Sequence, residues 1–314
     1  MTTPPSLASR STRIAGYACA LGAGIAWGTT GTLSTALYAQ GAPITGIGFW
    51  RLLIGLVPIV LYGLLHRDLF RIDLRGWLLV GLGGGALVAL FELAYQFAIS
   101  GTGVAGAAAL LYTAPVIVAL LAKPLLGEQL TSTRLLLAVV VFGGVALTVL
   151  GGSTTGVAVV TALRTGVIGG ALAALSYVGT TLLARYTVPR YGPARVLFLE
   201  ILGGLIILGI ILPLSHNRPT LPATPAAWVY VTVLAIVTVI AANVLFFNAS
   251  KRIDAAPTAV AATIEPVIAT LLALAIFHQQ LTLFGWIGLL LVVAGVAGGY
   301  LEEARTALHD ATTP

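Results

Sequence analysis

The sequence predicts an all-α membrane protein in which ten transmembrane helices form two inverted five-helix repeats around a central cavity. The 314-residue chain is 58% hydrophobic and only 8% charged, with a mean hydropathy of +1.03, whereas soluble domains carry roughly 25% charged residues. Ten stretches approach the length of about 20 apolar residues that a membrane span needs. Finally, residues 112–131 recur as residues 263–282, with nine of the twenty positions identical.

The first expected span follows Arg10 and Arg13, a pattern that is also compatible with a cleaved signal peptide. However, Trp27 aligns with Tyr177 at an offset of 150 residues. Removal of the first span would leave the sixth without a counterpart, so we expect it to remain. The ten spans are expected at residues 14–38, 45–65, 76–99, 104–122, 133–150, 166–184, 194–213, 226–249, 257–277 and 282–301.

The later spans are justified by the same repeat. The second span contains FWRLLIGL (49–56), which matches FLEILGGL (198–205) in the seventh, and Glu92 of the third falls opposite Asn243 of the eighth. The fourth and ninth spans carry the recurring segment, and the fifth and tenth complete each half. Five is an odd number, so the halves, residues 1–150 and 164–301, face opposite ways, as in many secondary transporters.

The basic residues predict the orientation. With a cytoplasmic amino terminus, thirteen Lys and Arg residues lie inside, whereas only Arg164 and Arg218 lie outside, as the positive-inside rule requires. Both termini, including the tail at residues 302–314, are therefore expected in the cytoplasm, with the protein in the inner membrane. The net charge of +6 is explained by this topology, and we expect no nucleic-acid partner because the basic residues form no single patch.

Several segments carry a family resemblance: AWGTTGTL (26–33), FWRLLIGL, the stretch from Pro115 to GEQLT (127–131), and EPVIATLLA (265–273). In this order and spacing the chain resembles the EamA family of the drug/metabolite transporter superfamily over nearly its whole length, and within it the bacterial exporters of aromatic amino acids. The resemblance implies a 5+5 inverted-repeat bundle that exports small metabolites. One departure is Gln279, which stands where the first copy has Glu128 and weakens any mechanism that needs a symmetric carboxylate pair there.

Ionisable side chains within a span are normally turned toward a cavity or a partner. Arg51 and Glu92 lie at similar depth, about 9 to 10 Å from the outer ends of their spans at ~1.5 Å per residue, so an ion pair is possible. Glu200 and Asn243 are the corresponding residues of the second half. These residues are expected either to gate the cavity and anchor a ligand, with Arg51 binding a carboxylate, or only to fix helix packing.

Glu265 lies near the middle of the ninth span without an obvious partner. A carboxyl group there is costly to ionise, which suits it to carry a proton or to hold an ammonium group; the alternative is a structural hydrogen bond to the backbone. Pro115 and Pro266 are expected to kink the fourth and ninth spans. An aromatic wall for an apolar side chain is expected from Trp27, Tyr95, Tyr112 and Tyr177.

No enzyme motif is present: HExxH, GxSxG, a Walker loop and a Rossmann glycine pattern are all missing from the sequence. The sequence therefore predicts no catalytic residue, no metal site and no cofactor. It favours a secondary carrier of amino acids whose partners are a small molecule, the lipid bilayer and, as a candidate, protons, with a monomer sufficient. The alternatives are a carrier of nucleotide sugars or drug-like cations, a membrane-embedded enzyme, and a channel or scaffold.

Overall fold

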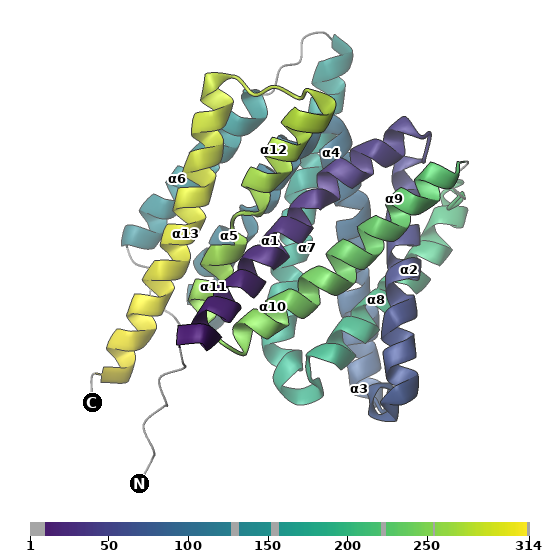
Figure 1. Cartoon of the computed structure of the whole chain (residues 1–314), viewed down its shortest axis with the longest axis horizontal. Helices are drawn as coiled ribbons and strands as arrows, with labels where there is room; N and C mark the ends of the chain where they lie inside the picture. Colours follow the sequence, from purple (N-terminus) through teal and green to yellow (C-terminus); the bar gives the residue numbers. More distant parts are fainter. Residues whose placement is uncertain (1–9, 127–131, 152–156, 221–223, 254, 313–314) are drawn as a thin grey trace.

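The computed structural model describes residues 10–126, 132–151, 157–220, 224–253 and 255–312, which fold into a bundle of helices (Figure 1). Two of its elements, η2 and η3, are π-helical stretches inside longer helices. The elements are α1 (Arg10–Ala39), α2 (Ile44–Leu65), η1 (Arg67–Phe70), α3 (Leu74–Gly76), η2 (Trp77–Gly84), α4 (Gly85–Leu111), α5 (Ala114–Leu126), α6 (Ser132–Leu150), α7 (Val157–Tyr191), α8 (Pro193–Leu214), α9 (Pro225–Ala235), η3 (Ile236–Ala241), α10 (Ala242–Ser250), α11 (Ala255–Ala262), α12 (Glu265–Phe277) and α13 (Leu283–Thr312).

Within the described residues, seven helical stretches are long and apolar enough to cross a membrane. The third and fourth expected spans fall together in one of them, the 45-residue stretch Leu74–Val118. The apolar part of the fifth expected span, Leu135–Leu150, is shorter than the others, and α1, which is rich in Gly and Thr, is not among the seven. The protein is an all-helical membrane protein, and the count of ten spans stays a prediction.

A single glycine interrupts the long stretch between the third and fourth expected spans. Gly103 has φ 73° and ψ 175° inside α4, a conformation that glycine adopts without the steric cost of a Cβ atom. The backbone N–H of Val104 then donates to Oε1 of Gln279, 3.3 Å away. Gln279 therefore has a structural contact, whereas its repeat counterpart, Glu128, lies outside the described residues.

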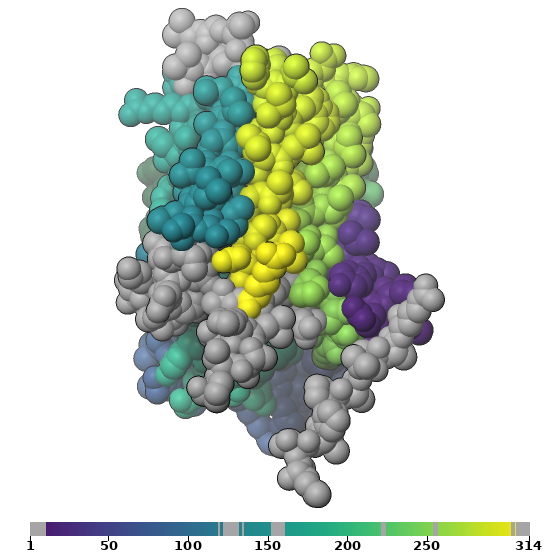
Figure 2. Space-filling model, turned by 90° about the vertical axis from the view of Figure 1, so that its left-hand side faces the viewer, coloured from purple at the N-terminus to yellow at the C-terminus, as the bar shows by residue number. Residues whose placement is uncertain are grey.

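Helices of the first half pack along helices of the second. α4 lies along α7, α1 along α10, and α6 along α13; Figure 2 shows α6 (teal) and α13 (yellow) side by side on one face. Glycines permit the closest approaches, because a Cβ atom added to Gly203 of α8 would lie 1.8 Å from the carbonyl oxygen of Gly81 in η2. The halves are thus joined by backbone contacts that larger residues would exclude.

Asp73, which precedes the long stretch, also joins the two halves. Its carboxylate caps α3 by accepting from the N–H of Gly76 at 2.8 Å. It also accepts from the hydroxyl of Tyr191 at 2.8 Å and from Nη2 of Arg190 at 3.0 Å. The hydrogen bonds from Tyr191 and then from Gly76 lower the pKa of Asp73 below its ordinary value.

Candidate functional site

One cavity of about 370 Å³ lies between helices of both halves. Its volume is in the range of small-molecule sites, which is roughly 300 to 1,000 Å³. All nine polar or aromatic side chains that the sequence predicted to bind substrate or gate the cavity line it: Trp27, Arg51, Glu92, Tyr95, Tyr112, Tyr177, Glu200, Asn243 and Glu265. The structure brings these nine residues together, and their roles stay predictions.

Arg51 of α2 and Glu92 of α4 form a buried ion pair at the cavity wall. Nη1 of Arg51 lies 3.0 Å from Oε1 and 3.2 Å from Oε2 of Glu92, and the two residues are only 7% and 4% exposed. Gly48 allows the approach, because a Cβ atom there would lie 2.8 Å from Cβ of Glu92. Removal of either partner would leave an uncompensated buried charge, which is strongly destabilising.

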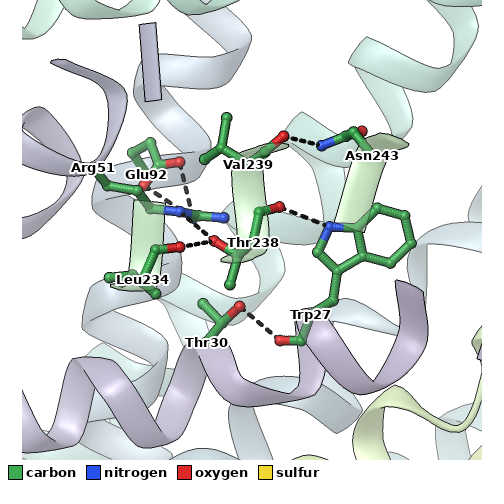
Figure 3. A network of polar contacts seen from close by, with 8 residues as sticks. All are labelled: Trp27, Thr30, Arg51, Glu92, Leu234, Thr238, Val239 and Asn243. Carbon is green, nitrogen blue, oxygen red and sulfur yellow. Dashed lines mark hydrogen bonds and ion pairs between the residues drawn. The ribbon is translucent and has the colours of Figure 1, made fainter. Parts of the chain in front are cut away.

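A third residue, Thr238 of η3, completes this contact. Its hydroxyl accepts a hydrogen bond from Nε of Arg51 at 3.1 Å and donates to the carbonyl oxygen of Leu234 at 2.6 Å (Figure 3). The ion pair belongs to the first half of the chain, whereas Thr238 belongs to the second. The contact therefore spans the two repeats.

The same part of η3 holds two further cavity residues (Figure 3). The indole Nε1 of Trp27 donates to the carbonyl oxygen of Thr238 at 3.1 Å, and Nδ2 of Asn243 donates to the carbonyl oxygen of Val239 at 2.9 Å. The Trp27 ring also contacts Phe246, with ring centroids 5.4 Å apart. One end of the indole is thus fixed by a hydrogen bond while the ring forms part of an aromatic wall.

Glu265 has a partner that the sequence did not reveal. The hydroxyl of Tyr112 lies 3.0 Å from Oε2 of Glu265 and 3.3 Å from the carbonyl oxygen of Ala262. The expectation of a carboxyl group without a partner was therefore wrong. The two residues occupy corresponding parts of the two repeats, and only the folded arrangement shows that they meet.

The two prolines begin new helices rather than bend continuous ones. α4 ends at Leu111 and α5 begins at Ala114, with Pro115 second in it; likewise α11 ends before α12, whose second residue is Pro266. Proline suits the first turn of a helix, where its missing N–H has no helical partner to lose. Pro115 lines the cavity, and Pro266 is buried in α12.

Glu200 and Asn243, the repeat counterparts of Arg51 and Glu92, do not form a matching contact. Oε1 of Glu200 is buried without a hydrogen-bond partner among the described residues, and the amide of Asn243 is used by its own helix. Glu200 packs against Gly84, where a Cβ atom would lie 2.9 Å from its Cγ. The cavity wall is therefore polar at both places, but an ion pair forms at only one of them.

Thr238 is the main contact residue that sequence reasoning missed. In the sequence it is one threonine within an apolar span, with nothing to distinguish it from the others. Its position in the structure depends on the π-helical turn. Phe91, which stacks on Tyr95 with centroids 5.4 Å apart, was likewise not singled out. The repeat alignment gave no signal for either residue.

Comparisons with known proteins agree with one another. The EamA-like transporter family matches residues 14–150 and again residues 164–300. An uncharacterized transporter from Archaeoglobus fulgidus is 30% identical over 273 residues, which cover 87% of this chain and 92% of that protein. A solved structure, described only as the crystal structure of a protein, is 21% identical with a TM-score of 0.60, and the match covers 94% of this chain and 98% of that one; this likeness shows the fold alone.

The two family matches include every residue described above as lining the cavity, and the family is one of transporters rather than enzymes. Together with the apolar helices, they make the protein a multi-pass membrane transporter. The chain belongs to the EamA-like transporter family.

Proposed function

We propose that this transporter is a secondary carrier that exports small metabolites, with aromatic and other neutral amino acids as the leading substrates. One observation carries the proposal: a single cavity combines a guanidinium group, carboxylates and an aromatic wall. A zwitterion with an apolar side chain needs these three kinds of partner.

The contacts suggest how such a ligand would bind. The ligand's ammonium group would meet Glu265, whose other neighbour is the Tyr112 hydroxyl. Its carboxylate would meet Arg51, because no hydrogen bond joins Nη2 of that residue to any described side chain or carbonyl (Figure 3). The ligand's side chain would pack against Trp27 and Phe246.

The unequal polar contacts of the two halves support alternating access. The Arg51–Glu92 pair is formed, and one turn further along α4 the hydroxyl of Tyr38 donates to Oε1 of Gln96 at 2.6 Å. The corresponding residues of the second half, Glu200 and Asn243, are apart. We infer that the two polar contacts close in turn as the inverted halves move around the ligand.

The orientation follows from the basic residues. With both termini in the cytoplasm of a cell whose inner membrane holds the protein, Arg51 and Glu92 close the outer side of the cavity. The side that holds Glu200 and Asn243, which form no matching contact, would then face the cytoplasm, from which an exporter takes its substrate. Glu265 is the candidate group that would bind either a proton or the ammonium group of the substrate, so that one replaces the other.

Counterflow tests the proposal directly. Purified protein is reconstituted in liposomes preloaded with unlabelled amino acids, and uptake of labelled phenylalanine, threonine and methionine is followed with and without a pH gradient. We expect counterflow of phenylalanine, since exchange is a property of carriers and not of channels. Lack of counterflow with all three, from folded protein, would contradict the amino-acid assignment.

A second candidate substrate class is the small organic cation. Three carboxylates line the cavity, and Arg51 is the one Lys or Arg among its described lining residues. This balance favours a positive charge on the ligand and disfavours nucleotide sugars, whose phosphates need several cationic groups. Transport of an aromatic amine at a rate above that of phenylalanine would favour this class.

A further inference from the structure

Thr238 is the only described residue that hydrogen-bonds both Arg51 and Trp27. Its hydroxyl lies 3.1 Å from Nε of Arg51, and its carbonyl oxygen lies 3.1 Å from Nε1 of Trp27. Figure 3 shows the side chains of Trp27 from α1 and Arg51 from α2 converging on this residue of η3. A displacement of Thr238 would therefore move both the guanidinium group of Arg51 and the indole ring of Trp27.

The π-helical turn makes this double contact possible. In an α-helix the N–H of Ala242 would bond to the carbonyl oxygen of Thr238, four residues earlier. Here that N–H bonds to Val237 instead, and the Thr238 carbonyl receives the indole N–H. Single π turns inside α-helices are frequent at functional sites.

The hydroxyl of Thr238 is already fully engaged by the protein. It donates to Leu234 and accepts from Arg51, and the residue is only 1% exposed. It therefore has little surface with which to contact a ligand. Its effect on a ligand has to pass through the two residues that it holds, and its effect on a carboxylate passes through Arg51.

The direction of the Arg51 guanidinium follows from these bonds. Nε is held by Thr238 and Nη1 by Glu92, so two points of the planar group are fixed on one side. Nη2 is left for a ligand at the cavity wall. A planar donor group that is held in this way loses little freedom when a carboxylate binds.

We propose that Thr238 is the positioning residue of the carrier: it aims Nη2 of Arg51 at the carboxylate of the ligand and links that anchor to the Trp27 wall. This inference rests on the proposed function, in which Arg51 binds a carboxylate. It adds a specificity-determining residue from the second half of the chain to an anchor in the first.

The test compares two ligands that differ only in the carboxylate. In the counterflow assay, phenylalanine and phenethylamine compete with labelled phenylalanine, and the ratio of their inhibition constants measures recognition of the carboxylate. For Thr238→Val, which keeps the shape and removes the hydroxyl, we expect this ratio to fall by about tenfold, as for the loss of one hydrogen bond to a charged group. Inhibition by phenethylamine is expected to change less than about twofold.

Matched variants separate positioning from folding. Thr238→Ser keeps the hydroxyl and should retain the wild-type ratio. Thr187→Val removes a buried hydroxyl that likewise bonds a carbonyl in the preceding turn, but that residue is not part of the cavity wall, so its ratio should stay unchanged. If Thr238→Val does not fold, Thr238→Ala replaces it in the comparison with Thr238→Ser.

The outcomes also separate this inference from the proposed function. Lack of phenylalanine counterflow in the wild-type protein would overturn the proposed function and the inference with it. Wild-type counterflow with an unchanged ratio in Thr238→Val would overturn the positioning role alone. If the ratio of inhibition constants fell equally in Thr238→Ser, the positioning role would also be overturned, because that variant keeps the hydroxyl.

Discussion

Individual side chains in the cavity divide into those held by protein partners and those left open to a ligand. Arg51 and Glu92 neutralise each other, whereas Oε1 of Glu200 has no partner among the described residues. Burial of a charge without a partner is costly. Donors and acceptors without a protein partner among the described residues, such as Nη2 of Arg51 and Oε1 of Glu200, are therefore where a substrate or a proton has the most to contribute.

Replacement of Arg51 by Lys tests the carboxylate anchor. Lysine keeps the positive charge beside Glu92 but lacks the planar guanidinium group, whose Nη2 is the donor left for the ligand carboxylate. We expect the KM for phenylalanine to rise by about tenfold, with inhibition by phenethylamine little changed. An unchanged KM in the counterflow assay would leave Arg51 only a packing role.

Replacement of Glu265 by Gln tests the ammonium and proton site. Glutamine keeps an oxygen that can accept from Tyr112 but has no titratable proton. We expect slower phenylalanine counterflow and loss of any response to a pH gradient. Tyr112→Phe serves as a control that removes the hydrogen bond and keeps the carboxylate, and wild-type rates of Glu265→Gln at every pH would refute the proton role.

Asp73 gives a pH dependence outside the membrane-spanning stretches. Its pKa is lower in the folded protein than in the unfolded chain, so its ionised form favours the folded state. The stabilisation is present above the ordinary pKa of about 4 and is lost as the pH falls through the lower, folded value. Thermal unfolding is measured at several values between about pH 3 and pH 7, a range that includes that ordinary pKa. The Asp73→Asn variant should lose less stability at acid pH than the wild type.

For individual residues, the sequence predicted the depth of a side chain in the membrane better than it predicted the residue that the side chain contacts. Equal depth in neighbouring spans was enough to suggest the Arg51–Glu92 pair, because ionisable groups in a bilayer seek each other. The meeting of Tyr112 and Glu265 was not predictable, since it depends on how two broken helices are placed across the repeat. Thr238 was missed because hydropathy carries no information about a π turn.

The helices themselves are positioned by glycine contacts. At the crossing of α8 and η2, a methyl group on Gly203 would overlap the carbonyl oxygen of Gly81. A backbone atom cannot move aside as a side chain does, so the two helices would have to separate. This crossing is therefore among the least tolerant positions in the fold.

Replacement of Gly203 by Ala should accordingly destabilise the protein. Overpacking of a tight contact costs about 1 to 3 kcal/mol, seen as a lower midpoint of thermal unfolding in detergent. Gly143→Ala on α6 is the matched control, because a Cβ atom there meets nothing within 4 Å. Equal midpoints for the two variants would contradict the tight crossing.

Most helices could be located from apolar length, but only some of their interruptions could be located from the sequence. Pro115 and Pro266 marked two of the breaks because proline cannot continue a helix without losing a hydrogen bond. Gly103 was not distinguishable from the other 36 glycines of the chain, since its positive φ is a property of the folded backbone. The π turns likewise lack a local signature in the sequence.

The molecule as a whole has two matching halves, and the prediction that they face opposite ways can be tested by labelling. In a Cys19→Ser background, single cysteines at Arg164 and Arg218 should react with an impermeant thiol reagent added outside intact cells. Cysteines at Arg71 and Lys251 should react only after the membrane is permeabilised, because positive residues face the cytoplasm. Labelling of all four from one side would contradict the inverted arrangement.

Alternating access predicts an exchange between the two polar contacts. Spin labels placed near the Arg51–Glu92 contact should separate when substrate and a gradient turn the cavity outward, while labels near Glu200 and Asn243 approach each other. The distances can be measured by pulsed electron resonance in liposomes. If the label distances at both contacts stayed constant during transport, the result would favour a fixed pore over alternating access.

The overall architecture was the most predictable level, because a repeat of 151 residues and membrane-length apolar segments constrain it together. Which helices of the two halves lie together, such as α6 along α13, was not predictable. Small residues that permit such contacts occur throughout this chain. Only the packed structure shows which of them are used.

Arg51 and Glu200 occupy equivalent places in the two repeats, yet they carry opposite charges. Two identical half-length chains that assembled as a pair could not differ in this way, since every substitution would appear on both sides. A single chain that contains both copies is free of that constraint, so each side of the cavity can carry its own charge. The opposite charges thus give the cavity an asymmetry that a pair of identical half-length chains would lack.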